Sequence, residues 1–250
     1  MISGDTAYLD LEFGYVYGTA RAVIMPIEIG VVVHRREDDS VRYAGDVFRY
    51  GIDVEIWKKV ADDCGRTVGV STSVANTGEG VYGKPYDHYF RLSPERTVSA
   101  QTISRAAFDD LRAFMVGLLD SGQVSRLVVF AADMEKMAFR EAGIPVESYT
   151  LVDLQREIKR QMSLRDVFSL DRVSRLVDFR TGDGVIASAH FEYPIPAAFQ
   201  GCLAPHRGMG DAARIFLLSR EFFDRREAFT KRIDALTRVC EASREPESGR

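Results

Sequence analysis

The chain has 250 residues, enough to bury a large core within one domain. Hydrophobic residues make up 46% and charged residues 28%, which are the proportions of an ordinary folded protein and exclude a mainly disordered chain. The formal net charge of -4 excludes a strong positive field over the whole molecule. An enzyme that meets phosphates through bound metal ions remains compatible with this charge.

The three cysteines, Cys64, Cys202 and Cys240, are odd in number and far apart, which argues against a disulfide framework and against a zinc site. The first residues lack a basic segment followed by an apolar one, and the most apolar stretch, 22–33, is interrupted by a proline and a glutamate. We therefore expect a cytoplasmic protein with reduced thiols and no membrane partner.

The first half of the chain is rich in strand signals. Residues 8–13, 25–34 and 47–54 carry many β-branched or aromatic residues and are predicted as strands. Residues 60–90 are rich in glycine and polar residues, and we expect a long loop there that closes over a substrate.

From Ser104, taken as an N-cap, the apolar residues follow a helical period as far as Gly122. Further on, the pattern predicts strands at 127–131 and 149–153, helices at 134–143, 169–177 and from 211, and an irregular segment at 181–205. Alternating strands and helices predict an α/β fold. We expect one domain over residues 1–240, with a loop insertion around 60–90, and a disordered tail at 241–250.

Two carboxylates lie one residue apart in the first predicted strand. Because side chains alternate between the faces of a strand, Asp10 and Glu12 share one face. Two close anions on a buried strand need a proton or a cation between them, which favours a metal site. The alternative is an edge strand with two solvated acids.

Other acids occur at comparable junctions. Asp133 follows an apolar strand and enters a helix, and Asp211 begins the last long helix five residues after His206. Each of these is most often a cap or a surface residue when considered alone. Together with the first pair they form a set of hard oxygen ligands with one imidazole, which suits two Mg²⁺ or Mn²⁺ ions better than zinc or copper.

At this point the chain resembles a known family. Asp10-Leu11-Glu12, then Ile27-Glu28-Ile29-Gly30-Val31, then Asp133, and finally His206-Arg207-Gly208-Met209-Gly210-Asp211-Ala212 are similar in order to the motifs of the DEDDh branch of the 3′-to-5′ exonucleases. The resemblance covers about residues 7–225 and implies a ribonuclease H-like fold, with a mixed central sheet flanked by helices. Two departures are Gly210, where members commonly carry an acidic residue, and the length of the 60–90 loop.

The resemblance also implies roles. Asp10 would bridge the two ions, Glu12 and Asp211 would hold the ion that carries the attacking water, and Asp133 would support the second ion. His206 would be the general base, since an unperturbed histidine titrates at about pH 6.5.

Leu11, Phe13 and Tyr15 are the candidates for contact with the terminal nucleotide, because they flank the metal ligands and an aromatic ring can stack on any base. Packing in the core is the alternative for Phe13 and Tyr15.

The expected function is hydrolysis of phosphodiester bonds from the 3′ end of single-stranded nucleic acid, with RNA favoured over DNA and nucleoside 5′-monophosphates as products. The alternatives are an inactive binding or scaffold module on the same fold and a two-metal phosphoesterase acting on small nucleotides. The sequence is also compatible with a homodimer.

Overall fold

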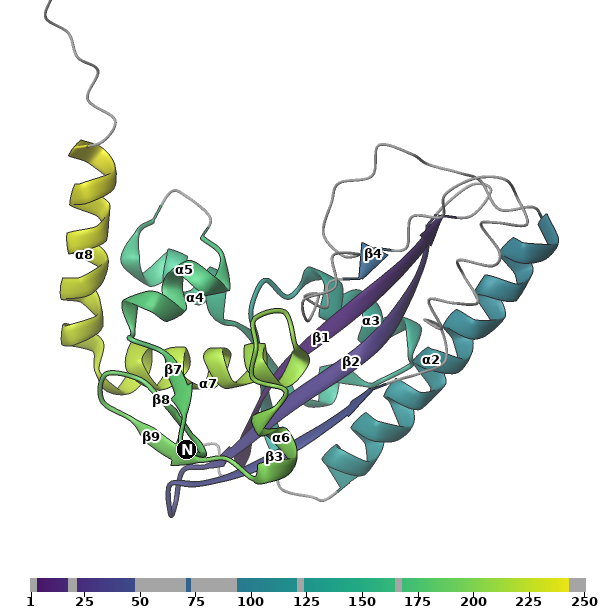
Figure 1. The fold of residues 1–250 in the computed structure, drawn as a ribbon, viewed down its shortest axis with the longest axis horizontal. Helices are drawn as coiled ribbons and strands as arrows, with labels where there is room; N and C mark the ends of the chain where they lie inside the picture. The colour runs from purple at the N-terminus through teal and green to yellow at the C-terminus, as the bar shows by residue number, and fades with distance from the viewer. Residues whose placement is uncertain are drawn as a thin grey trace, which may run out of the picture.

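A computed structural model describes residues 4–17, 22–47, 71–72, 94–120, 124–164 and 168–242. Its centre is a mixed sheet with the strand order β3-β2-β1-β5-β6 (Figure 1). Strands β1 (Asp5–Tyr17), β2 (Ala22–Arg35) and β3 (Ser40–Val47) are antiparallel neighbours. Strands β5 (Val124–Val129) and β6 (Thr150–Asp153) run parallel to β1, and the short β4 (Ser71–Thr72) pairs with the far end of β1. The predicted α/β class is confirmed.

Helices cover both faces of this sheet (Figure 1). One face carries α2 (Pro94–Asp120) and α3 (Asp133–Glu141), and the other carries α7 (Gly208–Asp224). The remaining elements are a 3₁₀ turn (Val146–Ser148), α4 (Leu154–Met162), α5 (Leu170–Leu176), α6 (Ala197–Gln200), α8 (Arg226–Ala242) and a small antiparallel sheet of β7 (Arg180–Gly182), β8 (Val185–Ala187) and β9 (Glu192–Pro194). In the part of the chain that the structure describes, no helix has the length and apolar character needed to span a bilayer.

The side chains of β1 divide between two hydrophobic clusters. Leu9, Leu11 and Phe13 are buried in the cluster that includes α2 and α3, whereas Tyr8 belongs to the cluster built around α7. Because neighbouring residues of a strand point to opposite faces, Asp10 and other even-numbered residues of this segment face α7. Glu12 also lies close to Asp211 of α7, so the packing agrees with the prediction that Asp10 and Glu12 share one face of β1.

Two glycines let helix α7 lie directly on strand β2. A Cβ atom on Gly30 would come 2.1 Å from the backbone of Gly208 and Met209, and one on Gly208 would come 2.7 Å from the nitrogen of Gly30. Real Cβ atoms do not make such contacts, so the two backbones approach only because both residues lack a side chain. This contact brings the start of α7 against the acidic part of the sheet.

A tight turn joins β5 to α3. Ala131 has a positive φ of 61°, and the following backbone N–H, that of Ala132, donates to the Asp153 carboxylate at 3.2 Å. The same carboxylate caps α4 by accepting the Arg156 N–H at 3.1 Å. Since β5 and β6 are parallel neighbours, Asp153 at the end of β6 ties the adjacent turn down and fixes where α3 begins.

Several predicted boundaries are wrong. Strand β3, Ser40–Val47, was not predicted. Helix α2 begins at Pro94, so Ser104 is an internal residue whose hydroxyl donates to the Ile24 carbonyl. The segment expected to be irregular contains the small sheet β7-β8-β9. The predicted strand at 48–54 and nearly all of the 60–90 loop lie outside the described residues, as does the tail beyond residue 242.

Candidate metal centre

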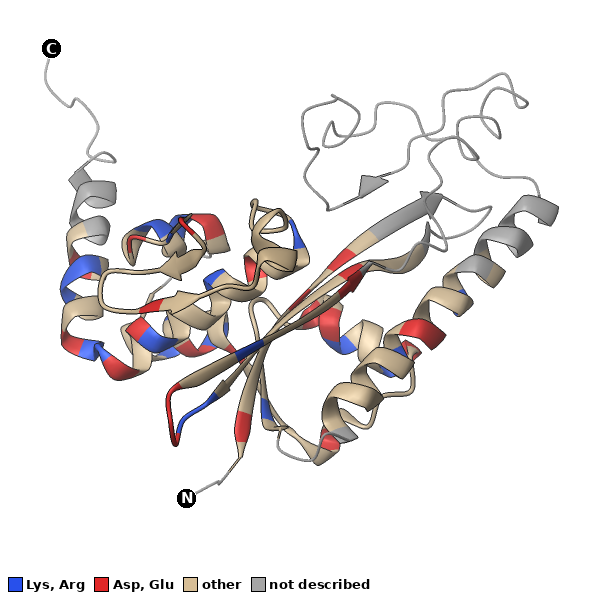
Figure 2. Ribbon diagram, turned by 60° about the horizontal axis from the view of Figure 1, so that its bottom comes forward, with Lys and Arg blue, Asp and Glu red and all other residues tan. Residues whose placement is uncertain are grey.

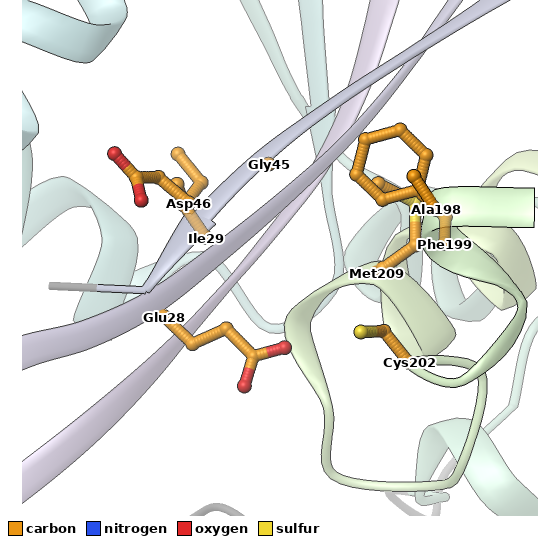
Figure 3. Close-up of a pocket in the computed structure, with 8 residues that line it drawn as sticks. All are labelled: Glu28, Ile29, Gly45, Asp46, Ala198, Phe199, Cys202 and Met209. Atoms are coloured by element: carbon orange, nitrogen blue, oxygen red, sulfur yellow. The ribbon is translucent and has the colours of Figure 1, made fainter.

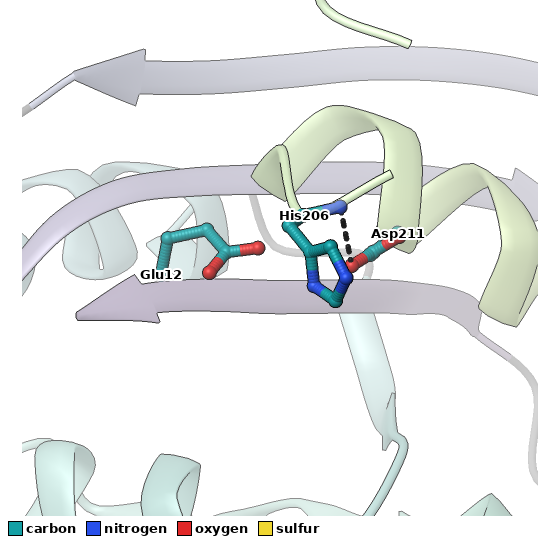
Figure 4. Close-up of side chains that lie close together, drawn as sticks. All are labelled: Glu12, His206 and Asp211. Carbon is teal, nitrogen blue, oxygen red and sulfur yellow. Dashed lines mark hydrogen bonds between the residues drawn. The ribbon is translucent and has the colours of Figure 1, made fainter. Parts of the chain in front are cut away.

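Three of the predicted residues meet at the junction of β1 and α7. Glu12, His206 and Asp211 each offer a ligand atom, and these atoms all lie within 4.8 Å of one another (Figure 4). The two carboxylates are buried, while the imidazole is exposed. Glu12 comes from the α7-facing side of β1, and Asp211 from the first turn of α7, which the Gly30–Gly208 contact holds against the sheet.

The loop before α7 holds His206 in a left-handed conformation, with φ at 57°. Its backbone N–H donates to Asp211 Oδ2 at 3.2 Å, so the turn closes on the carboxylate itself. On the side-chain end, Nε2 lies 3.8 Å from a carboxylate oxygen of Asp171 in the first turn of α5. The imidazole therefore stands between the buried carboxylates and solvent.

A buried ion pair anchors the same loop. Arg207 Nε donates to Glu28 Oε2 at 2.8 Å, and the Gly208 N–H donates to Glu28 Oε1 at 3.1 Å. Glu28 pairs in register with Glu12 across the β1–β2 ladder. Its carboxylate thus positions the loop that carries His206.

Asp10 lies next to this group on the same face of β1. Burial raises the pKa of Asp10 well above its usual range, and the carboxylates of Asp211, Glu12 and Glu135 raise it further. A raised carboxyl pKa means that the ionised form is poorly stabilised where it stands. A divalent cation would supply the missing stabilisation.

The sequence analysis did not single out Glu135, yet its carboxylate is buried and incompletely hydrogen-bonded. It projects from the first turn of α3, is 5% exposed, and its Oε2 atom has no hydrogen-bond partner among the described residues. Burial raises its pKa to about 7, and the nearby carboxylates of Asp153 and Glu12 contribute. A buried carboxylate without a partner is costly unless something binds it.

Asp133, the residue predicted as the fourth ligand, is not gathered into the cluster. Its side chain is 78% exposed and its carboxylate accepts from Arg156 Nη2 at 2.7 Å. Helix geometry separates the two acids of α3, because residues two apart point in directions about 200° apart. Figure 2 shows acidic segments of β1 and β2 near the acidic start of α3, and within that start it is Glu135 that is buried.

Two of the three residues predicted to contact substrate are buried in the core. Leu11 and Phe13 are buried in the cluster beneath α2, on the face of the sheet opposite α7, so neither is placed to stack on a nucleotide bound at the carboxylates. For Phe13 the core alternative is correct. Tyr15 lies in β1 opposite Ile24, and its side chain lies outside the described part.

Gly210, a departure from the family motif, has a local explanation. A Cβ atom at this position would come 2.2 Å from the Ala204 carbonyl oxygen and 2.8 Å from Leu203. The loop from residue 203 to the histidine therefore crosses directly over the first turn of α7. An acidic side chain cannot be accommodated there without moving this loop.

A cavity of about 260 Å³ lies on the β3 side of Glu28 (Figure 3). It is lined by Glu28, Ile29, Gly45, Asp46, Ala198, Phe199, Cys202 and Met209. Cys202 is a free thiol that also receives a long contact, 3.7 Å, from Arg207. Glu28 lines this cavity, and its carboxylate also binds Arg207 and Gly208. The cavity therefore lies next to the residues that hold the His206 loop in place.

The cluster is suited to a hard cation. Glu12 and Asp211 offer carboxylate oxygens, the ligands that Mg²⁺ and Mn²⁺ prefer, with the His206 imidazole beside them. Asp10 and Glu135 are further acids whose pKa values are raised by burial and by the Glu12 carboxylate. Comparisons with family models, with curated proteins and with solved structures found no match to this chain.

Proposed function

We propose that this protein is a two-metal 3′-to-5′ exonuclease that releases nucleoside 5′-monophosphates from single-stranded ends. Two observations carry the proposal: the cluster of Glu12, His206 and Asp211, and the buried, unpartnered Oε2 of Glu135, whose pKa the Glu12 carboxylate helps to raise. An acidic cluster alone is common on protein surfaces. A buried carboxylate oxygen without a hydrogen bond, under the influence of other acids, favours a bound cation.

Asp10, Glu12, Glu135 and Asp211 would hold the ions. When bound, two divalent ions would stabilise the attacking and leaving oxygens of an in-line phosphodiester displacement. The chain itself contributes the rigid placement of these ligands, because one pair lies on a central strand and the others begin helices packed on opposite faces of the sheet.

His206 would act as the general base. Its exposed imidazole adjoins the buried carboxylates, so it is placed to take a proton from water at the cluster and release it to solvent. The Asp171 carboxylate, 3.8 Å from Nε2, would favour the ring orientation in which the other nitrogen faces the cluster. The proposed proton path therefore ends at the surface.

The sheet topology also supports the proposed exonuclease function. A three-stranded antiparallel meander extended by two parallel strands, with helices on both faces, agrees with the ribonuclease H-like architecture that the motif resemblance implies. We keep single-stranded RNA as the favoured substrate.

The test is one gel with matched variants. The protein is incubated with 5′-labelled single- and double-stranded RNA and DNA, and with a dinucleotide, in Mg²⁺, Mn²⁺ or EDTA. We expect a ladder that shortens from the 3′ end and requires metal. Glu135→Gln should lower the rate by about 10²-fold or more, since an amide cannot replace an anionic ligand. Asp133→Asn, two residues away and exposed, should retain most activity.

Four outcomes would contradict the proposal or part of it. Equal loss in both variants would return Asp133 to the ligand set, and full activity of Glu135→Gln would remove Glu135 from it. Cleavage of the dinucleotide alone would favour the small-nucleotide phosphoesterase. Binding of single strands without cleavage in either metal would indicate a binding module.

A further inference from the structure

A buried arginine contacts one of the proposed ligands. Arg214 lies one turn after Asp211 on α7, is 7% exposed, and donates from Nη1 to Asp211 Oδ1 at 2.9 Å. Its guanidinium carbon stands 4.8 Å from the ring centre of Phe179. Nothing in the hydrolysis proposed above uses this residue.

The pair matters electrostatically. Arg214 Nη1 and Asp211 Oδ1 lie 2.9 Å apart, and only 8% and 11% of the two side chains are exposed, so the ion pair is buried. An arginine stays charged in a protein interior, whereas a buried carboxylate can escape its cost by taking up a proton. Arg214 thus provides a permanent positive charge at an otherwise acidic centre.

The geometry leaves room for a metal ion. Arg214 donates to Oδ1 of Asp211, and the His206 N–H donates to Oδ2. A carboxylate oxygen accepts two such interactions, so both atoms retain capacity. The two hydrogen bonds hold the Asp211 carboxylate in place, and a ligand atom of Glu12 lies within 4.8 Å of it.

We propose that Arg214 is a positioning residue, a built-in cation that pairs with Asp211 and holds its carboxylate in orientation before metal ions bind. The inference rests on the proposed two-metal function. It predicts that a divalent ion and Arg214 partly substitute for each other in stabilising the acidic centre. A residue that merely packs on Phe179 would not show this dependence on metal.

The experiment measures thermal unfolding of the full chain in EDTA and in saturating Mn²⁺. Arg214→Met should lower the midpoint in EDTA by on the order of 10 °C, because it leaves a buried charge unpaired. Mn²⁺ should restore at least half of that loss. Adding Asp211→Asn to Arg214→Met should restore stability in EDTA, since the unpaired charge is then gone.

Arg220→Met is the matched control. Arg220 lies on the same helix, stacks on Phe191 at 4.3 Å and pairs with Asp224 at 2.6 Å, at the end of α7 away from the carboxylates. Its loss should lower the midpoint equally in both buffers. Arg214→Lys, which keeps the charge, should lie between wild type and Arg214→Met in EDTA.

Equal losses in EDTA and Mn²⁺ for Arg214→Met, without recovery in the double variant, would overturn the proposal. If Arg214→Met is insoluble, a soluble double variant supports the proposal and an insoluble one refutes it. Failure of the proposed function is recognised separately, because wild type would then show no Mn²⁺-dependent rise in midpoint. Recovery by Asp211→Asn in EDTA would still identify the charge pairing in that case.

Discussion

His206 combines a strained backbone with an exposed ring. Few residues other than glycine adopt a positive φ, and asparagine does so more readily than alanine. His206→Asn therefore removes the imidazole while it preserves the turn whose N–H binds Asp211. We expect kcat to fall by about 10²- to 10⁴-fold in both His206→Asn and His206→Ala, with little change in KM.

A metal-binding measurement separates the two roles open to His206. If the imidazole acts as base, the Mn²⁺-induced rise in the unfolding midpoint should be the same in His206→Asn as in wild type. Loss of that rise would make His206 a ligand, as its distance to Glu12 and Asp211 also permits. A kcat within about twofold of wild type would exclude both roles.

The sequence predicted an acid at the start of α3 but selected Asp133, whereas the buried acid is Glu135. Both acids lie in the first turn of the same helix, and a strand-to-helix junction favours the first as a ligand. Which one faces the sheet depends on the turn at Ala131, whose left-handed backbone rotates the start of α3. The helical period does offer a signal, since Ala138 and Phe139, three and four residues after Glu135, are both buried.

Helix α7 reaches the sheet through backbone contact, which makes Gly30 a critical position. Gly30→Ala would place a methyl group 2.1 Å from the Gly208–Met209 peptide, and neither strand nor helix can yield without moving the other. We expect a loss of stability on the order of 3 kcal/mol, together with weaker Mn²⁺ binding because Asp211 would be displaced from Glu12. Circular dichroism and metal titration would measure the two effects.

Gly117→Ala is the control for this prediction. Gly117 lies within α2, and a Cβ atom there would meet nothing within 4 Å. Alanine is the better helix former by about 1 kcal/mol, so this variant should be unchanged or slightly more stable. A Gly30→Ala protein that matched it in stability and in Mn²⁺ binding would show that the helix can be displaced without cost.

Helices and strands with a clear periodic or β-branched pattern were predicted from the sequence, whereas features that depend on distant contacts were not. The β-branched run of β2, the apolar β5 and the periodic α7 were identified within a few residues. The start of α2 was placed ten residues late, because Ser104 resembles an N-cap in sequence while its hydroxyl serves the Ile24 carbonyl across the fold. Strands β7 to β9 are three residues each, too short for alternation to be recognised.

Over the whole molecule, the acidic centre should control how stability depends on pH when metal is absent. The pKa of Glu135 is raised to about 7, and the pKa values of Asp10 and Asp211 are raised as well. The folded state therefore binds more protons than the unfolded chain between about pH 4.5 and pH 7. Stability contributed by these groups is present below that window and is lost as pH rises through it.

Burial of His34 acts in the opposite direction. Its pKa is lowered, so below about pH 6.5 the unfolded chain takes up a proton at this residue more readily than the folded chain does. Acid thus costs stability at His34 while it adds stability at the carboxylates. A single pH profile of the wild type would mix the two contributions.

The comparison with Glu135→Gln isolates the carboxylate. In EDTA, wild type should lose on the order of 3 kcal/mol relative to this variant between pH 5 and pH 8, because the amide has no proton to lose and His34 is common to both. In Mn²⁺ the sign should reverse, since the ion binds the ionised carboxylates and stabilises wild type increasingly as pH rises. Chemical denaturation at several pH values measures both differences. Parallel profiles in EDTA would mean that Glu135 is ionised without cost, and the cation inferred from its buried oxygen would lose its support.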